Sequence, residues 1–335
     1  MAPAIAELTR PAAPRSTIRD VSSTSPVSLD SFVGQTHVVE AVQVGLDACR
    51  QDGTRFPHSL FVGPPGLGKS NLVQIIAQEL GVELRETLGQ TLVQSSDLAA
   101  LLLEAEDQQI IFIDEADELA GEHQTLLYRA LAERKLFLQR GRGGKAARSL
   151  DLENFTLILA SNHESRLARP LVDRFKMLCR FEFYASPEIL RLLEDRIAAL
   201  GWQCEEEVLS LLAQRSRGVP RLALRLLESA RRTSRSQGAD ILCVQHFDRM
   251  CRIEGIDQRG LDRTERAYLH ILATAKVPVR LGVIADRLGL PSRTISGVIE
   301  AFLVRQGLIS RSDDGRQLTE EGASYIRETV VSVAP

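Results

Sequence analysis

The chain has 335 residues, of which 44% are hydrophobic and 25% are charged, and its formal net charge is −3. This composition is ordinary for a globular protein of two or three domains, and no apolar run reaches transmembrane length. The small negative charge gives no overall attraction to nucleic acid, so any DNA contact requires a local basic surface. The five cysteines are scattered without C-x-x-C spacing, which favours reduced thiols in a cytoplasmic protein over disulfides or a zinc site.

The N-terminal residues 1–28 are rich in Ala, Pro, Ser and Thr, and they show neither helical nor strand periodicity. We expect a disordered tail there. Arginines among small residues would also suit an organelle transit peptide, but two acids in the segment argue against one. Ordered structure should begin near Leu29 and lead into a helix with Val38, Val42 and Leu46 on its apolar face.

A glycine-rich segment, Gly63-Pro64-Pro65-Gly66-Leu67-Gly68-Lys69-Ser70, fits the phosphate-loop pattern G-x-x-x-x-G-K-[ST]. It follows an apolar strand at 60–62 and precedes a helix at 71–80, which is the required context. The glycines allow backbone N–H groups to surround a phosphate, the lysine neutralises the β- and γ-phosphates, and the serine can hold Mg²⁺. A plain glycine turn would not need the Lys-Ser pair. The predicted ligand is a nucleoside triphosphate, bound by Gly66, Gly68, Lys69, Ser70 and Asn71.

Two acids follow the next strongly apolar strand. Residues 84–88 and 110–113 read as strands and residues 96–105 as a helix, so strands and helices alternate as in a mostly parallel, doubly wound α/β sheet. The second of these strands ends in Asp114-Glu115-Ala116-Asp117, at the sheet edge where ligands bind in such folds. We expect Asp114 to support Mg²⁺ and Glu115 to polarise the attacking water, in preference to a solvated acidic loop.

The stretch from 122 to 175 adds a hairpin and two further candidates. A helix is expected at 122–133, and strands at 135–139 and 149–152 flank a basic glycine-rich turn, which is either a solvated loop or a contact for DNA or a partner. A buried strand at 155–160 leads to Asn162, which can reach a γ-phosphate. In an oligomeric ATPase, Arg174 lies where an arginine supplied to the neighbouring subunit's nucleotide would be found.

Two helical segments complete the chain. Residues 186–254 read as helices at 188–200, 205–216 and 222–232, and Arg221 at the start of the last is either a surface arginine or a partner for a nucleotide phosphate. Residues 261–329 carry helices at 264–275, 281–288 and 292–305 and a two-stranded wing at 308–318, a DNA-binding arrangement. Its charges nearly cancel, so a protein-binding module is the rival. Arg311 and Arg316 are the expected phosphate contacts.

Taken together, these features resemble the RuvB family of hexameric AAA+ motors, which drive Holliday-junction branch migration with the junction-binding protein RuvA. The similarity covers about residues 29–329. It rests on Phe32-Val33-Gly34-Gln35, the phosphate loop, Ala146-Ala147-Arg148-Ser149, Phe155-Thr156-Leu157-Ile158, Asp173-Arg174-Phe175, Phe181-Glu182-Phe183-Tyr184 and Gly218-Val219-Pro220-Arg221.

The resemblance implies an AAA+ P-loop core at 29–185 with a projecting hairpin at about 135–152, a small helical lid at 186–254 and a winged-helix domain at 255–335. It implies an ATPase with ATP and Mg²⁺ that forms a homo-oligomer, expected to be a hexamer, on duplex or four-way junction DNA with a RuvA-like partner. By the same resemblance, Asn162 is the first sensor, Arg174 the trans-acting arginine and Arg221 the second sensor. Tyr184 would pack near the adenine.

Several departures from the family pattern are visible. Asp117 replaces the usual His of Asp-Glu-Ile-His, and Val172 replaces an arginine. The hairpin tip is more basic than usual, so we hypothesise a divergent paralogue or an element-borne version with a changed partner. The leading function is an ATP-driven DNA motor in recombination and repair. The alternative is an ATP-controlled DNA-binding switch, like initiators and clamp loaders, and a protein-remodelling ATPase is disfavoured because no aromatic pore loop is evident.

Overall fold

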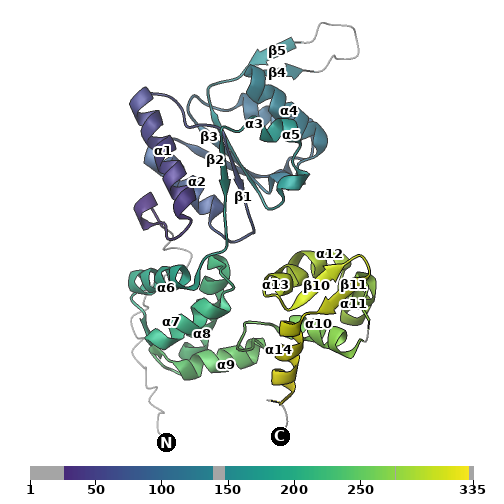
Figure 1. Ribbon diagram of the computed structural model, residues 1–335. Helices are drawn as coiled ribbons and strands as arrows, with labels where there is room; N and C mark the ends of the chain where they lie inside the picture. The colour runs from purple at the N-terminus through teal and green to yellow at the C-terminus, as the bar shows by residue number, and fades with distance from the viewer. Residues whose placement is uncertain (1–25, 139–147, 276, 332–335) are drawn as a thin grey trace, which may run out of the picture. The chain divides into compact units, whose positions relative to one another are not determined.

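The computed structural model describes residues 26–138, 148–275 and 277–331 (Figure 1). The chain divides into two compact units, one of Met1–Arg232 with Ala239–Ile241 and one of Thr233–Gly238 with Leu242–Pro335. Most of the predicted N-terminal tail lies outside the described residues. The finer domain boundaries expected at 185 and 254 remain predictions. Along the described residues, no helix is long and apolar enough to cross a membrane.

The first unit contains a five-stranded parallel sheet with the strand order β2-β3-β6-β1-β7. Helices α1 and α2 lie on one side of the sheet and α3, α4 and α5 on the other (Figure 1). The doubly wound α/β fold predicted from the alternating strands and helices is therefore confirmed. The strands are β1 (Ser59–Val62), β2 (Leu84–Leu88), β3 (Ile110–Asp114), β6 (Thr156–Ser161) and β7 (Met177–Arg180). The helices are α1 (Thr36–Asp52), α2 (Lys69–Leu80), α3 (Ser95–Leu103), α4 (Gly121–Glu133) and α5 (Arg169–Val172).

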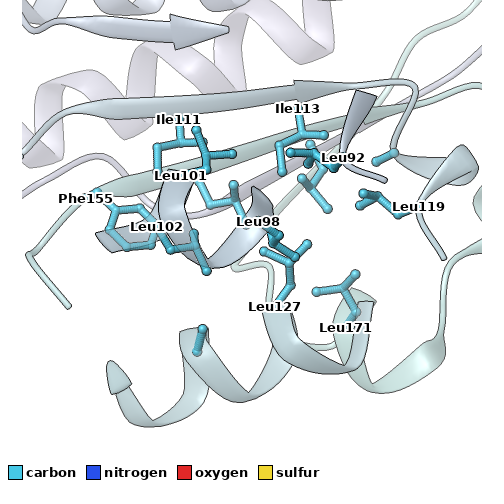
Figure 2. Close-up of a cluster of buried hydrophobic side chains, with 14 of the residues drawn as sticks. Leu92, Leu98, Leu101, Leu102, Ile111, Ile113, Leu119, Leu127, Phe155 and Leu171 are labelled. Carbon is cyan, nitrogen blue, oxygen red and sulfur yellow. The ribbon is translucent and has the colours of Figure 1, made fainter. Parts of the chain in front are cut away.

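Burial on both faces explains why the central strands are continuously apolar. Ile111 and Ile113 of β3 pack into a cluster with residues of α3, α4 and α5, as Figure 2 shows. The alternate residues Ile110 and Phe112 are equally buried, and successive side chains of a strand point to opposite faces. The short strand β7 was not predicted: its apolar run, Met177-Leu178-Cys179, has three residues, of which only Cys179 is buried at this edge of the sheet.

The helical lid follows the sheet and is tied to it by backbone hydrogen bonds. The Tyr184 N–H donates to the Gly218 carbonyl at 2.9 Å, and the Arg221 N–H donates to the Gly66 carbonyl at 3.3 Å. These bonds bring the lid to the glycine-rich loop. The lid elements are α6 (Ser186–Leu200), β8 (Gln203–Cys204), α7 (Glu206–Arg215), α8 (Pro220–Ser236) and β9 (Ile241–Leu242).

The second unit contains the predicted winged helix. Tyr268, Leu269, Ile284 and Leu303 are among the residues of its buried core, and a capping box between Asp262 and Glu265 begins α10. The predicted helix at 292–305 contains one π-helical turn, and the helix after the wing was not predicted. The elements are α9 (Val244–Glu254), α10 (Arg263–Thr274), α11 (Leu281–Leu288), α12 (Ser292–Thr294), η6 (Ile295–Ile299, π-helical), α13 (Glu300–Arg305), β10 (Ile309–Ser312), β11 (Gly315–Leu318) and α14 (Glu320–Val331).

The predicted hairpin is present at the end of α4. Its antiparallel strands β4 (Lys135–Leu138) and β5 (Arg148–Asp151) pair Leu136 with Leu150. Leu136 is buried in the core beside α4, so the base of the hairpin is fixed to the sheet domain. The basic turn predicted at 140–145 lies outside the described residues.

Candidate nucleotide site

The glycine-rich loop joins β1 to α2 and has the backbone that its sequence requires. Gly63 has φ +150°, and a Cβ there would lie 2.6 Å from the Phe181 carbonyl oxygen. Gly68 has φ +98° and caps α2, so Lys69 and Ser70 occupy the first turn of the helix. The N–H groups of a first turn have no partner within the helix and favour an anion. The loop therefore fits a phosphate group.

Lys69 is a buried cation whose three hydrogen-bond acceptors are all neutral. Its Nζ donates to the carbonyl oxygens of Gly63 at 2.6 Å and Pro64 at 2.9 Å, and to Asn162 Oδ1 at 3.0 Å. The residue is only 6% exposed, and burial lowers the pKa of its ammonium group to about 8; Asp114 raises this pKa in part. Because burial lowers this pKa although the carboxylates of Asp114 and Asp117 raise it, the charge of Lys69 is only partly compensated, and an incoming anion would be favoured here.

Ser70 and Asp114 form the predicted pair of oxygen donors. The Ser70 hydroxyl donates to Asp114 Oδ2 at 2.8 Å, and Asp114 Oδ1 accepts the Glu115 N–H at 2.8 Å. A hydroxyl and a carboxylate are ligands that Mg²⁺ takes from proteins, together with phosphate oxygens. Glu115 itself has φ +53°, a left-handed conformation that is costly for a residue other than glycine and is found preferentially at functional sites.

Asn162 directly follows β6, and Asp117 fixes its backbone by hydrogen bonds. Asp117 Oδ1 accepts from the Ser161 hydroxyl at 3.0 Å and from the Asn162 N–H at 3.1 Å. The predicted sensor is thus beside Lys69, and its backbone is fixed by Asp117, which in the sequence is only a departure from the family pattern. No local sequence pattern predicts this contact, because Asp117 and Asn162 are 45 positions apart.

The lid contributes the predicted Arg221 and one arginine that was not predicted. A pocket of about 340 Å³ lies between the sheet domain and the helical lid of the first unit. Its lining residues include Lys69, Ser70, Asn71, Asp114, Glu115, Asn162, Arg196 and Arg221. Arg196 of α6 is 7% exposed, and burial lowers the pKa of its guanidinium. Arg196 falls at helical spacing among the buried Ile189, Leu193 and Ile197 of α6, and this position on the apolar stripe is the one sequence signal that could have indicated it.

A second pocket of about 400 Å³ adjoins the first and contains the predicted Tyr184, together with Phe32, Val33 and Leu192. The Tyr184 hydroxyl donates to the Leu67 carbonyl at 3.2 Å, so the ring braces the glycine-rich loop, and burial raises the pKa of this phenol. An apolar, aromatic pocket beside a phosphate site suits a nucleobase.

Arg174 does not line either pocket. It is exposed and follows α5, where its N–H donates to the Leu171 carbonyl at 3.0 Å. Its side chain is therefore available to another molecule, as expected for an arginine that acts on a neighbouring subunit.

The two wing arginines have different surroundings in the second unit. Arg316 Nε donates to Glu300 Oε1 at 2.9 Å, whereas Arg311 Nη1 is 3.6 Å from Glu300 Oε2. Glu300 is fully buried and also accepts from the Tyr268 hydroxyl at 2.9 Å. The Arg316 side chain is 20% exposed and that of Arg311 46%. The predicted DNA contacts are therefore not equivalent.

Comparison with known proteins identifies the family. Residues 24–181 match the model of the Holliday junction DNA helicase RuvB P-loop domain, and residues 258–327 match the RuvB C-terminal winged helix domain. The RuvB subunit of the Holliday junction branch migration complex from Neorickettsia sennetsu is 36% identical over 92% of this chain and 94% of its own. The chain belongs to the RuvB family.

Solved structures agree with this RuvB assignment. The RuvB Holliday junction branch migration motor of Thermotoga maritima has 31% identity and a TM-score of 0.79 over 90% of this chain and 98% of its own. A mutant of the same protein gives a TM-score of 0.81 with the same identity and coverage. The predicted family and the AAA+ core, lid and winged helix are confirmed. As a RuvB-family P-loop protein, the chain is an ATPase and binds a nucleotide.

Proposed function

We propose that this chain is an ATP-driven motor of Holliday-junction branch migration, which hydrolyses ATP in a homo-oligomeric ring to move duplex DNA. The observation that carries the proposal is the buried Lys69, held by neutral oxygens beside Ser70 and Asp114 in a chain that matches the RuvB models at both ends. A triphosphate supplies negative charge that the three neutral acceptors of Lys69 do not.

The residues of the pocket have different roles in phosphoryl transfer. Lys69 and Arg221 bind the phosphates and neutralise charge, and Asn162 and Glu115 orient and polarise the attacking water. Ser70 and Asp114 would hold Mg²⁺, which supplies further charge neutralisation when bound. Since phosphoryl transfer depends mainly on positioning and electrostatic stabilisation, these groups suffice for hydrolysis once an arginine completes the site.

Arg174 supplies that arginine to the neighbouring subunit. It is exposed and lies outside the residues that line its own pocket, which supports a role in trans. Hydrolysis would then require two copies of the chain, and a closed ring, expected to be a hexamer, gives every site an arginine.

The proposed motor function also implies two partners, DNA and a loading protein. Four-way junction DNA is the substrate, the winged helix contacts duplex DNA, and a RuvA-like protein loads the ring. The name of the Neorickettsia relative, a subunit of a branch migration complex, supports a partner of this kind. The divergent hairpin at about 135–152 would alter that contact.

The test is ATP-dependent dissociation of a synthetic four-way junction, with and without a RuvA protein. We expect dissociation by the wild type, bound but unhydrolysed ATP in Glu115→Gln, and a loss of ATPase turnover of about 1,000-fold in Arg174→Ala. Arg50→Ala, which removes an exposed arginine paired with Glu79, is the matched control and should keep its activity. ATP hydrolysis without strand movement under any partner would favour the ATP-controlled DNA-binding switch. Normal ATPase in Arg174→Ala would exclude the oligomeric site.

A further inference from the structure

The segment from Ser161 to Ala168 connects the sensor to the arginine for the neighbouring subunit. Asn162 lies at its beginning, and Ala168 caps α5, after which Arg174 follows. Two buried polar side chains of another part of the chain, Asp117 and Gln124, make hydrogen bonds to this segment. We call these bonds the double tie.

Asp117 holds the beginning of the segment. It accepts from the Ser161 hydroxyl and from the Asn162 N–H, at 3.0 and 3.1 Å, and its Oδ2 is 3.9 Å from Arg166 Nη1. Because the side chain of Asn162 contacts Lys69, Asp117 determines where the sensor amide points.

Gln124 of α4 holds the end of the segment. Its Nε2 donates to the carbonyl oxygens of Leu119 at 3.1 Å and Arg166 at 3.2 Å, and its Oε1 accepts the Ala168 N–H at 2.6 Å. Gln124 is 5% exposed, so these bonds are shielded from water and are costly to leave unmade. The start of α5, and through it the backbone of Arg174, is fixed to α4.

Lys69 places the beginning of the segment at the nucleotide site. An ammonium group has three N–H donors, and here Gly63, Pro64 and Asn162 accept from it. A γ-phosphate that receives a hydrogen bond from Lys69 must replace one of these acceptors or share its donor. Asn162 is the only side chain among the three, so it is the acceptor that can move without displacing the loop backbone.

We propose that the double tie makes residues 161–168 a rigid link, which holds the Arg174 offered to the next subunit in a fixed position relative to the sensor Asn162 of its own site. Asp117 and Gln124 are positioning residues in this link. The inference rests on the proposed function, because it requires that Arg174 acts in trans.

The test uses mixed oligomers in which each subunit supplies one half of a site. Glu115→Gln subunits supply only the arginine, and Arg174→Ala subunits supply only the pocket, so mixing them should restore ATPase activity. We then add Gln124→Met to one partner at a time. On the arginine-supplying subunit it should lower the restored activity about tenfold or more, since a misplacement of about 1 Å can cost about 100-fold. On the pocket-supplying subunit the activity should stay within about twofold, because its arginine is already absent.

Each outcome of this experiment has one meaning. If the two parent variants restore no activity, the oligomeric function and the link fail together. If they do, but Gln124→Met has equal effects on both partners or no effect on either, the link alone is wrong. Thr125→Ala is the matched control, because its hydroxyl bonds only the Gly121 carbonyl of its own helix, at 2.9 Å. If Gln124→Met does not fold, Gln124→Glu keeps the acceptor for Ala168 and should show the same asymmetry to a smaller degree.

Discussion

The pocket of the first unit and the wing of the second each hold a largely buried cation, and they treat it in opposite ways. The hydrogen-bond acceptors of Lys69 are neutral oxygens, and its burial lowers the pKa. Arg316 is paired with the fully buried Glu300, and the hydrogen bond to that carboxylate raises its pKa. A cation whose hydrogen-bond acceptors are neutral can bind an anionic ligand, whereas a cation paired with a buried carboxylate stabilises the fold.

The largest effect should follow from breaking the wing pair. Arg316→Ala leaves the Glu300 carboxylate buried beside the Tyr268 hydroxyl without its main cation, and we expect the second unit to lose about 3–5 kcal/mol of stability. Hydrogen exchange of the α10 amides in the full chain measures this loss. The double variant Arg316→Met with Glu300→Gln should recover most of it, because no buried charge remains. A loss under about 1 kcal/mol would show that the pair contributes little.

Removal of Lys69 should affect binding and leave the fold intact. Lys69→Ala should weaken ATP binding about 100-fold, or about 3 kcal/mol, since hydrogen bonds to charged phosphates are lost. Titration with a fluorescent ATP analogue gives the Kd. Lys176→Ala, which removes an exposed lysine of the same unit, is the control. Unfolding of Lys69→Ala should require at least as much denaturant as the wild type, opposite to the result for Arg316→Ala. A Kd within threefold of the wild type would contradict the phosphate role.

The pH dependence should be of intermediate size and should separate the two cations further. The free Lys69 has a pKa of about 8 in the fold, against the ordinary lysine value of 10.5. Above pH 8, ATP binding must restore a proton, so the Kd should rise about tenfold per pH unit. Between pH 8 and 10.5 the unfolded chain binds more protons than the fold, so stability without nucleotide should increase with pH in that window. Titrations from pH 7 to 9.5 measure the first effect, and Lys69→Arg should abolish it.

The sequence predicted the features whose signals are local. The phosphate loop, the acid pair after β3 and Asn162 after β6 each lie at the end of an apolar strand, and parallel strands bring these ends to one edge of the sheet. The long-range contacts that position these residues were not predictable from the sequence. Asp117 reaches Asn162 across 45 positions, and its place in an acidic run gives no partner.

The wing shows the same limit. The near balance of acidic and basic residues in this domain was visible, but only packing shows that Glu300 is the acid that becomes buried against Arg316. The π-helical turn at Ile295–Ile299, directly before Glu300, is likewise absent from the helical periodicity that predicted one continuous helix. The sequence shows which residues are charged and which segments are helical. Which charges become paired, and where a helix is distorted, depend on the tertiary fold.

The smallest effect is expected at Arg311, and it decides whether the wing has one DNA contact or two. Arg311 is about half exposed and 3.6 Å from Glu300, so it can reach a phosphate, and Arg311→Ala should weaken duplex binding severalfold and reduce the salt dependence of log K by about 0.9. Arg316→Met with Glu300→Gln removes the second cation together with its buried partner and should leave that slope unchanged. Fluorescence anisotropy with duplex DNA across a salt series measures both slopes. Equal reductions would mean that Arg316 leaves Glu300 for DNA, and a buried carboxylate would then bind its cation only until DNA arrives.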